Sequence, residues 1–269
     1  MFRLLLKHDW RGIRGTLGLL SLICLGAATV GGFAMRSMIL LTEQNDPSVF
    51  QTIITMFAIM VSFIAMGITS AGTLFFCIWR FYRSRYSDEG YMTFTLPATT
   101  HQILLSSLTA TILAMLCIGA ALVLGIGVLM AIGLTAIPDF YSEAVREFPR
   151  LWSEITYVFR EESGPFLSML LYSPVAVVAE IIILMLSVTI GCVAVRKLKV
   201  LAAIGVYYGI NVVVSLANTI IMVLSGFLSS NSIDFYNQFF LYPTFLMLVL
   251  GTGGYFLMHR LANKKINLP

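Results

Sequence analysis

The sequence RFYRSRYSDEGYMTFTLPATTHQ, residues 80–102, is a short polar segment between two of the longest apolar runs in the chain. Three arginines, Arg80, Arg83 and Arg85, lie at its start. A loop this short between two membrane spans stays close to the bilayer surface, and Lys and Arg concentrate in loops on the cytoplasmic side. The arginines therefore predict a cytoplasmic loop that joins two transmembrane helices.

The composition of the whole chain agrees with this assignment. Its 269 residues are 58% hydrophobic and only 11% charged, with a mean hydropathy of +0.90. A soluble domain carries about 25% charged residues, so the sequence predicts an integral membrane protein. The length suits six spans in a single transmembrane domain, residues 1–269, without room for a separate catalytic domain. The expected fold is all-α, with spans at about residues 16–41, 49–79, 103–137, 166–194, 201–228 and 241–258.

The distribution of charge predicts how the chain crosses the membrane. With six spans and both termini in the cytoplasm, 13 of the 17 Lys and Arg residues fall in inner segments. Nine of the 13 acidic residues then fall in outer segments. This arrangement satisfies the positive-inside rule at every loop, and the N- and C-termini are therefore expected to be cytoplasmic.

Two amphipathic segments are expected outside the spans. Residues 2–14 carry a basic stripe beside an apolar one, which predicts an N-terminal interfacial helix in the headgroup layer. Residues 138–165 carry aromatic and aliphatic residues at helical spacing between acidic ones, which predicts amphipathic extracellular helices. Two pieces are expected there, because Pro149 disfavours a helix interior. Two roles stay open for them: a cap on the outer ends of the spans, or a gate that receives or releases an amphipathic cargo.

The middle of the cytoplasmic loop is predicted to form a docking helix. It starts with a good N-cap residue followed by acids, which are favourable in a first helical turn. The residues after the glycine are too apolar for a freely solvated loop, so a partner or the membrane surface is expected to cover them. The predicted contact residues are Ser87, Asp88, Glu89, Gly90, Tyr91, Met92 and Phe94.

The run S-D-E-G-Y-x-T-x-T-L-P at residues 87–97 resembles the small type-2 ATP-binding-cassette (ABC) exporter permeases of Gram-positive bacteria. In that family this loop is the coupling helix, which docks into a groove on the ATPase subunit. The resemblance implies a dimer of permease subunits, identical or homologous, in the bacterial cytoplasmic membrane, with ABC ATPase subunits docked from the cytoplasm. Many relatives carry a lysine shortly after Leu-Pro. Here residues 104–107 read LLSS, so no role of that lysine is transferred.

Catalysis by this chain alone is not expected. The sequence has no G-x-x-x-x-G-K-[ST] motif to hold ATP phosphates and no H-E-x-x-H zinc motif. Its histidines, His8, His101 and His259, are isolated in the sequence. No catalytic residue, metal site or cofactor is therefore assigned to the chain, and ATP with Mg²⁺ is expected on the partner ATPase. The four cysteines lie in apolar segments and are expected to be small buried apolar residues.

Three polar residues inside the spans are candidates for a substrate path, namely Glu180, Asn211 and Asn218. An ionisable residue at mid-span is costly and is expected to face the bundle interior or a wet cavity. Asn211, Asn218 and hydroxyls such as Ser187 are the expected partners of Glu180. Its role is left open between a structural hydrogen bond, a contact with cargo and proton coupling.

The sequence thus predicts the permease subunit of an exporter that moves a hydrophobic or amphipathic substrate, such as a peptide, an antimicrobial compound or a lipid. Besides the ATPase and a second permease, the lipid bilayer is an expected partner. No nucleic acid is expected to bind. One alternative is an ion-coupled secondary transporter that uses Glu180, although no internal repeat supports it. Another is a membrane scaffold or immunity protein that transports nothing.

Overall fold

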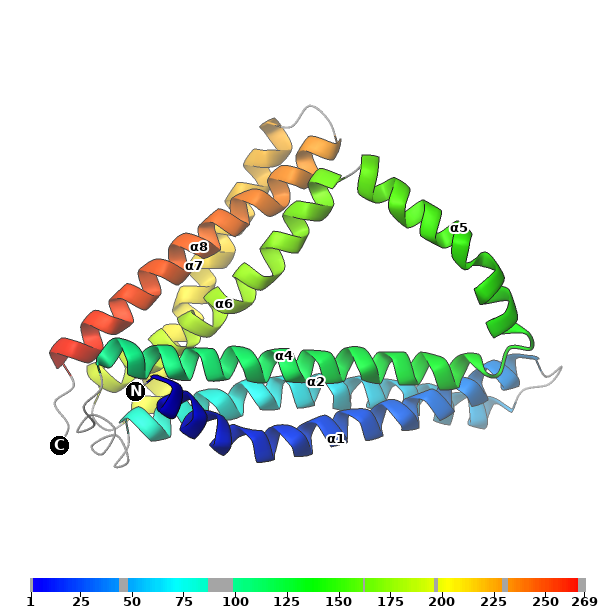
Figure 1. Ribbon diagram of the computed structural model, residues 1–269, viewed down its shortest axis with the longest axis horizontal. Helices are drawn as coiled ribbons and strands as arrows, with labels where there is room; N and C mark the ends of the chain where they lie inside the picture. The colour runs from blue at the N-terminus through cyan, green and yellow to red at the C-terminus, as the bar shows by residue number, and fades with distance from the viewer. Residues whose placement is uncertain are drawn as a thin grey trace. The chain divides into compact units, whose positions relative to one another are not determined.

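The computed structural model describes residues 2–43, 48–86, 99–161, 163–195, 198–228 and 232–265. These residues form α-helices and contain no strand (Figure 1). The helices are α1 (Phe2–Glu43), α2 (Val49–Tyr86), α4 (Thr100–Leu134), α5 (Phe140–Glu161), α6 (Ser163–Ala194), α7 (Lys199–Leu228) and α8 (Ser232–Lys265).

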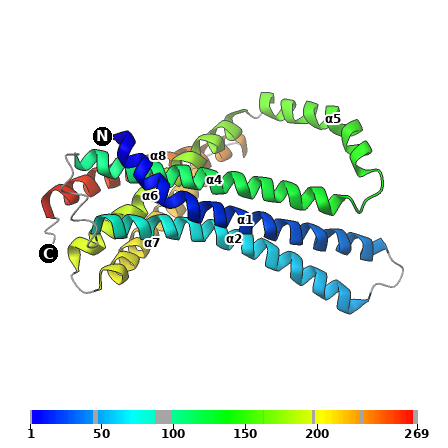
Figure 2. The ribbon, with the colours of Figure 1, turned by 60° about the horizontal axis from the view of Figure 1, so that its bottom comes forward.

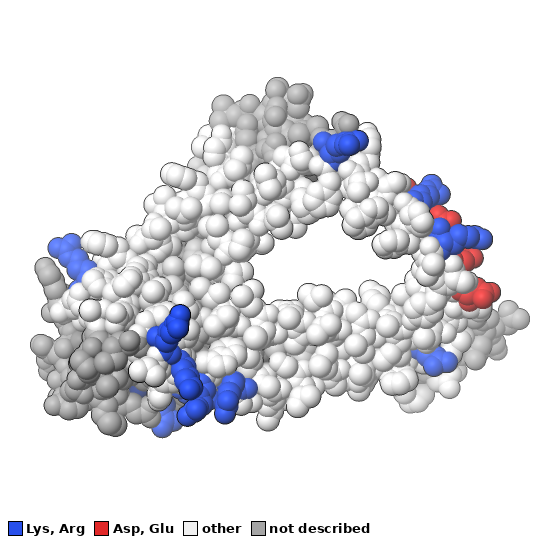
Figure 3. Space-filling model, viewed as in Figure 1, with Lys and Arg blue, Asp and Glu red and all other residues white. Residues whose placement is uncertain are grey.

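Within the described residues, six of these helices are long and apolar enough to cross a membrane. The exception is α5, which is amphipathic. Five of the six predicted spans fall within the six apolar helices, and the third, 103–137, extends three residues past the end of α4 at Leu134. The acidic side chains visible in the space-filling view gather over α5, whereas the spanning helices are largely free of charge on that face (Figure 3). The chain is therefore an all-helical, multi-pass membrane protein.

One compact unit contains α1, most of α2 and most of α4, which run side by side (Figures 1 and 2). Small residues bring these helices close together. A methyl group added at Gly31 would lie 2.8 Å from Cβ of Ser62, and one added at Gly32 would lie 2.9 Å from Cβ of Ile132. These two glycines therefore lie at close contacts between helices. Gly26 has no neighbour within 4 Å and is not part of the contact.

The second compact unit contains α6, α7 and α8 together with the end of α2 and the start of α4 (Arg80–Leu108). In this unit α6 packs against both α7 and α8. Ala179, Val214 and Met247 form the buried centre of this three-helix group. Since α6 contributes to both interfaces, it is the central helix of the group.

The boundaries predicted for the loop between the second and third spans are wrong at both ends. Helix α2 continues through the three arginines to Tyr86, and α4 already begins at Thr100. Arginine is a good helix former, and its long side chain can keep its charge away from hydrocarbon while its backbone stays helical. Helix therefore extends into the polar segment from both sides.

The segment before α6 also differs from the prediction. It forms one helix, α5, with Pro149 inside it, and not two pieces. Proline removes a single backbone hydrogen bond and bends a helix without having to end it. The apolar stripe of α5 includes Val145, Trp152 and Ile155, which are all exposed.

At the N-terminus, the predicted interfacial segment is the first part of α1 and not a separate helix. Its basic stripe is exposed as expected, but the apolar side chains Leu6 and Trp10 pack against a buried cluster formed by α1, α2 and α4.

The cysteines also differ from the expectation that all four are buried. Cys24 and Cys77 are buried, whereas Cys117 is exposed on an apolar helix surface.

The contact between α6 and α7 gives a test of this packing. A methyl group added at Gly191 would lie 2.5 Å from the backbone nitrogen of Ala203 and 2.9 Å from its Cβ. Because backbone atoms cannot move aside cheaply, we expect Gly191→Ala to lower the free energy of unfolding by about 1–3 kcal/mol. The control is Gly209→Ala in α7, where nothing lies within 4 Å. It should be neutral or stabilising, because alanine favours helix. Equal stability of the two variants in a detergent unfolding titration would contradict this crossing.

Candidate functional site

The predicted docking residues Ser87, Asp88, Glu89, Gly90, Tyr91, Met92 and Phe94 lie outside the described residues. The helix ends on either side of them are described, and each is tied to other helices. At the end of α2, Arg85 is 2% exposed and donates hydrogen bonds to the Ser107 hydroxyl at 2.9 Å and to the Ile103 carbonyl at 3.3 Å. The last turn of α2 is therefore held against the first turns of α4.

The neighbouring residue, Tyr86, joins α2 to α6. Its hydroxyl lies 2.8 Å from Oγ1 of Thr189, and both residues are buried. The Thr189 hydroxyl itself donates to the Met185 carbonyl at 2.9 Å. Tyr86 is therefore the donor in the pair, and both hydroxyl groups are satisfied.

On the other side of the loop, the start of α4 is joined to α8. The ring nitrogen Nδ1 of His101 lies 2.8 Å from the hydroxyl of Tyr255. The ring of His259, one turn further along α8, lies edge-on to His101 with 6.2 Å between centroids. The sequence predicts that the histidines are isolated from one another. This prediction is wrong for His101 and His259. No group of three or more metal-ligating side chains occurs within the described residues.

Within the spans, Glu180 is half-buried on α6 and accepts a hydrogen bond of 2.6 Å from the hydroxyl of Tyr207 on α7. Two of its expected partners are engaged elsewhere, and Asn218 makes no bond to it. Ser187 donates to the Ile183 carbonyl and Asn211 donates to the Tyr207 carbonyl. A tyrosine reaches further than an asparagine, so it bridges the two helices at a separation that the shorter side chain does not span.

Polar side chains continue from Tyr207 along one face of α7. Asn211, Ser215 and Thr219 follow at intervals of four residues, and Asn218 lies beside them. Residues three and four apart lie on the same face of a helix. This spacing in the sequence indicates the polar stripe, but the sequence analysis identified only Asn211 and Asn218 as candidates.

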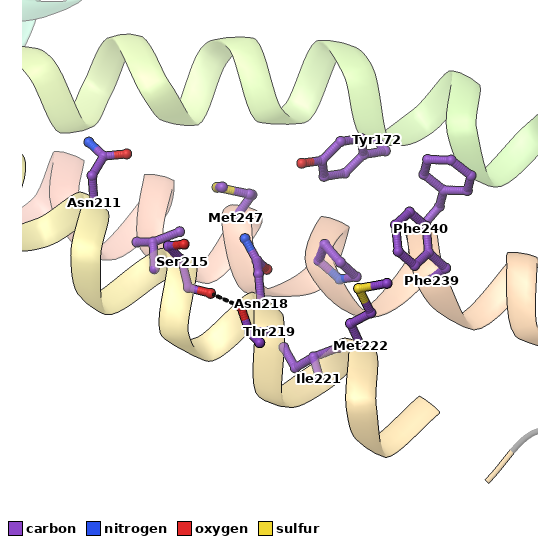
Figure 4. Close-up of a pocket in the computed structure, with 12 residues that line it drawn as sticks. Tyr172, Asn211, Ser215, Asn218, Thr219, Ile221, Met222, Phe239, Phe240 and Met247 are labelled. Carbon is purple, nitrogen blue, oxygen red and sulfur yellow. Dashed lines mark hydrogen bonds between the residues drawn. The ribbon is translucent and has the colours of Figure 1, made fainter. Parts of the chain in front are cut away.

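The polar stripe forms one wall of a pocket of about 360 Å³ between α6, α7 and α8 (Figure 4). In Figure 4 Asn211 and Asn218 extend from α7 on the side that faces α6, and Tyr172 extends from α6 beside them. The rest of the lining is largely apolar and aromatic: Val214, Ile221, Met222, Phe239, Phe240, Pro243 and Met247. Sequence reasoning missed Tyr172, Phe239 and Phe240, because nothing local in the sequence shows that they face α7.

The polar groups of this pocket differ in how fully they are satisfied. The Thr219 hydroxyl donates to the Ser215 carbonyl at 2.9 Å, within the helix. Oδ1 of Asn218 is buried and has no hydrogen-bond partner among the described residues. A buried acceptor without a donor costs about 1–3 kcal/mol. The pocket therefore combines an apolar lining with an uncharged side chain whose buried acceptor is unsatisfied. An apolar lining with a few polar groups is the usual makeup of a small-molecule site.

Comparisons of the chain with protein-family models, with curated proteins and with solved structures gave no match. Any assignment of function therefore rests on the residues and their geometry.

The bond between α6 and α7 can be tested with a double-mutant cycle on Tyr207→Phe and Glu180→Met. Each single variant removes one partner and should lower stability, and the pair should be coupled by about 0.6–1.7 kcal/mol, the range measured for hydrogen bonds between membrane helices. Glu180→Gln keeps an acceptor oxygen and should unfold close to the parent in a detergent titration. Strictly additive single variants would show that the two side chains do not interact.

Proposed function

We propose that this chain is the permease subunit of a type-2 ABC exporter in a bacterial cytoplasmic membrane. It would move a hydrophobic or amphipathic molecule outward, and a separate ATPase would supply the energy. The observation that carries the transport assignment is the pocket with the polar stripe, which lies among helices that are otherwise apolar. A polar-lined pocket at membrane depth is costly for a scaffold, whereas a transporter needs one to offer an amphipathic molecule an alternative to lipid.

The link to an ATPase rests on the loop between α2 and α4. Its sequence carries the resemblance to the coupling loop, and its two ends are tied to the helices that line the pocket. Tyr86 bonds to α6 and His101 bonds to α8. A partner that pushed on this loop would therefore act on both helices. This connection supports an exporter driven from the cytoplasmic side.

A role for Glu180 in ion coupling has less support. The carboxylate already accepts the Tyr207 hydroxyl across the α6–α7 interface, and it is not among the residues that line the pocket. Its geometry is that of an interhelix hydrogen bond. A secondary transporter remains the second candidate, and Glu180→Gln separates the two, because ion-coupled export would stop while ATP-driven export would continue.

The proposed topology can be tested with single cysteines in a chain whose four native cysteines are replaced by alanine. Ser153 lies on α5, proposed to be extracellular, and Leu198 lies in the short connection before α7, proposed to be cytoplasmic; both are exposed. In intact cells an impermeant maleimide should label Ser153→Cys and should spare Leu198→Cys until the cells are opened. Labelling of Leu198→Cys from outside would reverse the orientation and remove the coupling-loop proposal with it.

The coupling loop itself is tested by Tyr91→Ala in a tagged chain purified from its native cells. We expect an ABC ATPase to co-purify with the parent and its recovery to fall about tenfold or more in the variant, because a buried aromatic anchor carries a large share of interface energy. Tyr157→Ala is the control, since this exposed tyrosine lies on α5. Unchanged recovery with Tyr91→Ala would show that the loop is only a connector. Absence of any P-loop ATPase from the parent complex would overturn the proposed function.

A further inference from the structure

We propose that the pocket between α6, α7 and α8 binds the polar end of an uncharged amphiphile, and that this end is an amide. The inference deepens the proposed function and rests on it only in treating the bound molecule as cargo. The site consists of Asn211 and Asn218 on α7, Tyr172 on α6, and the apolar and aromatic side chains of α8 (Figure 4).

The size of the pocket limits what can enter. Ligand pockets are typically about 300–1,000 Å³, and this one, at about 360 Å³, lies at the small end. A folded peptide or a bulky headgroup does not fit in that space. A single small polar group with the first part of its apolar chain does, and the side chains of Met222, Phe240 and Met247 would surround that chain.

The absence of charge selects the headgroup further. Among the described residues that line the pocket, none is Asp, Glu, Lys, Arg or His. An ionised group moved into this site would lose its hydration and find no opposite charge, which is far more costly than burying a neutral polar group with a partner. The ligand is therefore uncharged.

The hydrogen-bonding groups separate an amide from an ester. Oδ1 of Asn218 is buried without a donor, and the amide nitrogen of the same side chain carries two N–H donors. An amide matches both groups through one N–H and one carbonyl, in the paired geometry that two carboxamides form with each other. An ester only accepts, so it would leave Oδ1 of Asn218 without a donor.

A second polar contact lies further along the same wall. Asn211 precedes Asn218 by seven residues, a rise of about 10 Å along α7, and its amide nitrogen already donates to the Tyr207 carbonyl. This leaves Asn211 with less freedom to rotate than Asn218. Asn218 is therefore the residue that recognises the amide, and Asn211 and Tyr172 widen the polar wall around it.

The experiment compares three probes that share a brominated eleven-carbon chain, which quenches tryptophan fluorescence, and differ only in the head: 11-bromoundecanamide, its methyl ester and its carboxylate. The purified full chain in lipid nanodiscs carries Phe239→Trp as a reporter in the pocket, and the parent chain corrects for quenching of Trp10, Trp79 and Trp152. We expect the amide to half-quench the reporter at a concentration about tenfold lower than the ester, the ratio that corresponds to one buried hydrogen bond. The carboxylate should bind more weakly still.

The variant Asn218→Leu keeps the size of the side chain and should remove the preference for the amide over the ester. If that variant does not purify as a single species, Asn218→Ala serves in its place. Thr252→Val is the matched control, since Thr252 lies on α8 outside this pocket and its hydroxyl donates to the carbonyls of its own helix. The control should keep the full preference for the amide over the ester.

An amide can come from an N-acyl lipid or from a peptide bond. If acetyl-leucyl-leucinamide displaces the probe, the source is a peptide. If it does not displace the probe, the source is a lipid.

Equal quenching by the amide and the ester, or an amide preference that survives both Asn218 variants, would overturn the site. Disulfide formation between two copies of an Asn218→Cys chain would also overturn it, because the polar stripe would then be covered by a second subunit. The outcome is separable from the proposed function. An amide preference without ATP-driven export would support the proposed amide site and contradict the proposed exporter function. ATP-driven export without the amide preference would support the exporter function and contradict the amide site.

Discussion

The structure depends on one constraint, which is that polar groups in a hydrocarbon layer have no water to bond to. The backbone meets it by forming helices throughout the spans. Most hydroxyl side chains meet it by donating to a carbonyl one turn earlier, as Thr73 does to Thr69 and Ser187 to Ile183. Bonds that leave their own helix are informative, because they show which helices are held together. Glu180 with Tyr207 and Tyr86 with Thr189 fix pairs of helices that apolar contacts alone would leave free to slide.

Close packing of small residues follows from the same constraint. Lipid chains are as apolar as leucine side chains, so burial of apolar surface does little to hold spans together. Helices gain instead from close contacts, and these occur where a glycine faces a neighbouring helix, as at Gly31 and Gly32 of α1 and at Gly191 of α6. Large apolar residues are left to face lipid, for example Leu22, which is 71% exposed. Burial of apolar residues, the usual guide to the core of a soluble protein, is therefore a poor guide to the core here.

The sequence predicted the number and order of the spans, because apolar runs and charge patterns report directly on the membrane. It did not predict where α2 ends, because Arg80, Arg83 and Arg85 are equally compatible with a loop and with a last helical turn. It identified Glu180 as a residue that needs a partner but not the partner, since the choice of Tyr207 depends on the crossing of α6 and α7. The pairing of His101 with Tyr255 depends likewise on contacts between residues 154 positions apart, for which one sequence holds no signal.

The arrangement of α6 and α8 suggests how events at the loop reach the pocket. Thr189, the partner of Tyr86, lies 17 residues from Tyr172 on α6, which is about 25 Å along a helix. Helices transmit displacement over such a distance because their backbone bonds make them stiff. Each of the two helices has a proline close to the pocket, Pro174 in α6 and Pro243 in α8. Proline removes a backbone hydrogen bond, so a helix bends most easily there. A displacement of the loop ends would therefore bend α6 and α8 most easily at these prolines, which lie next to Tyr172 and Phe240 in the pocket wall.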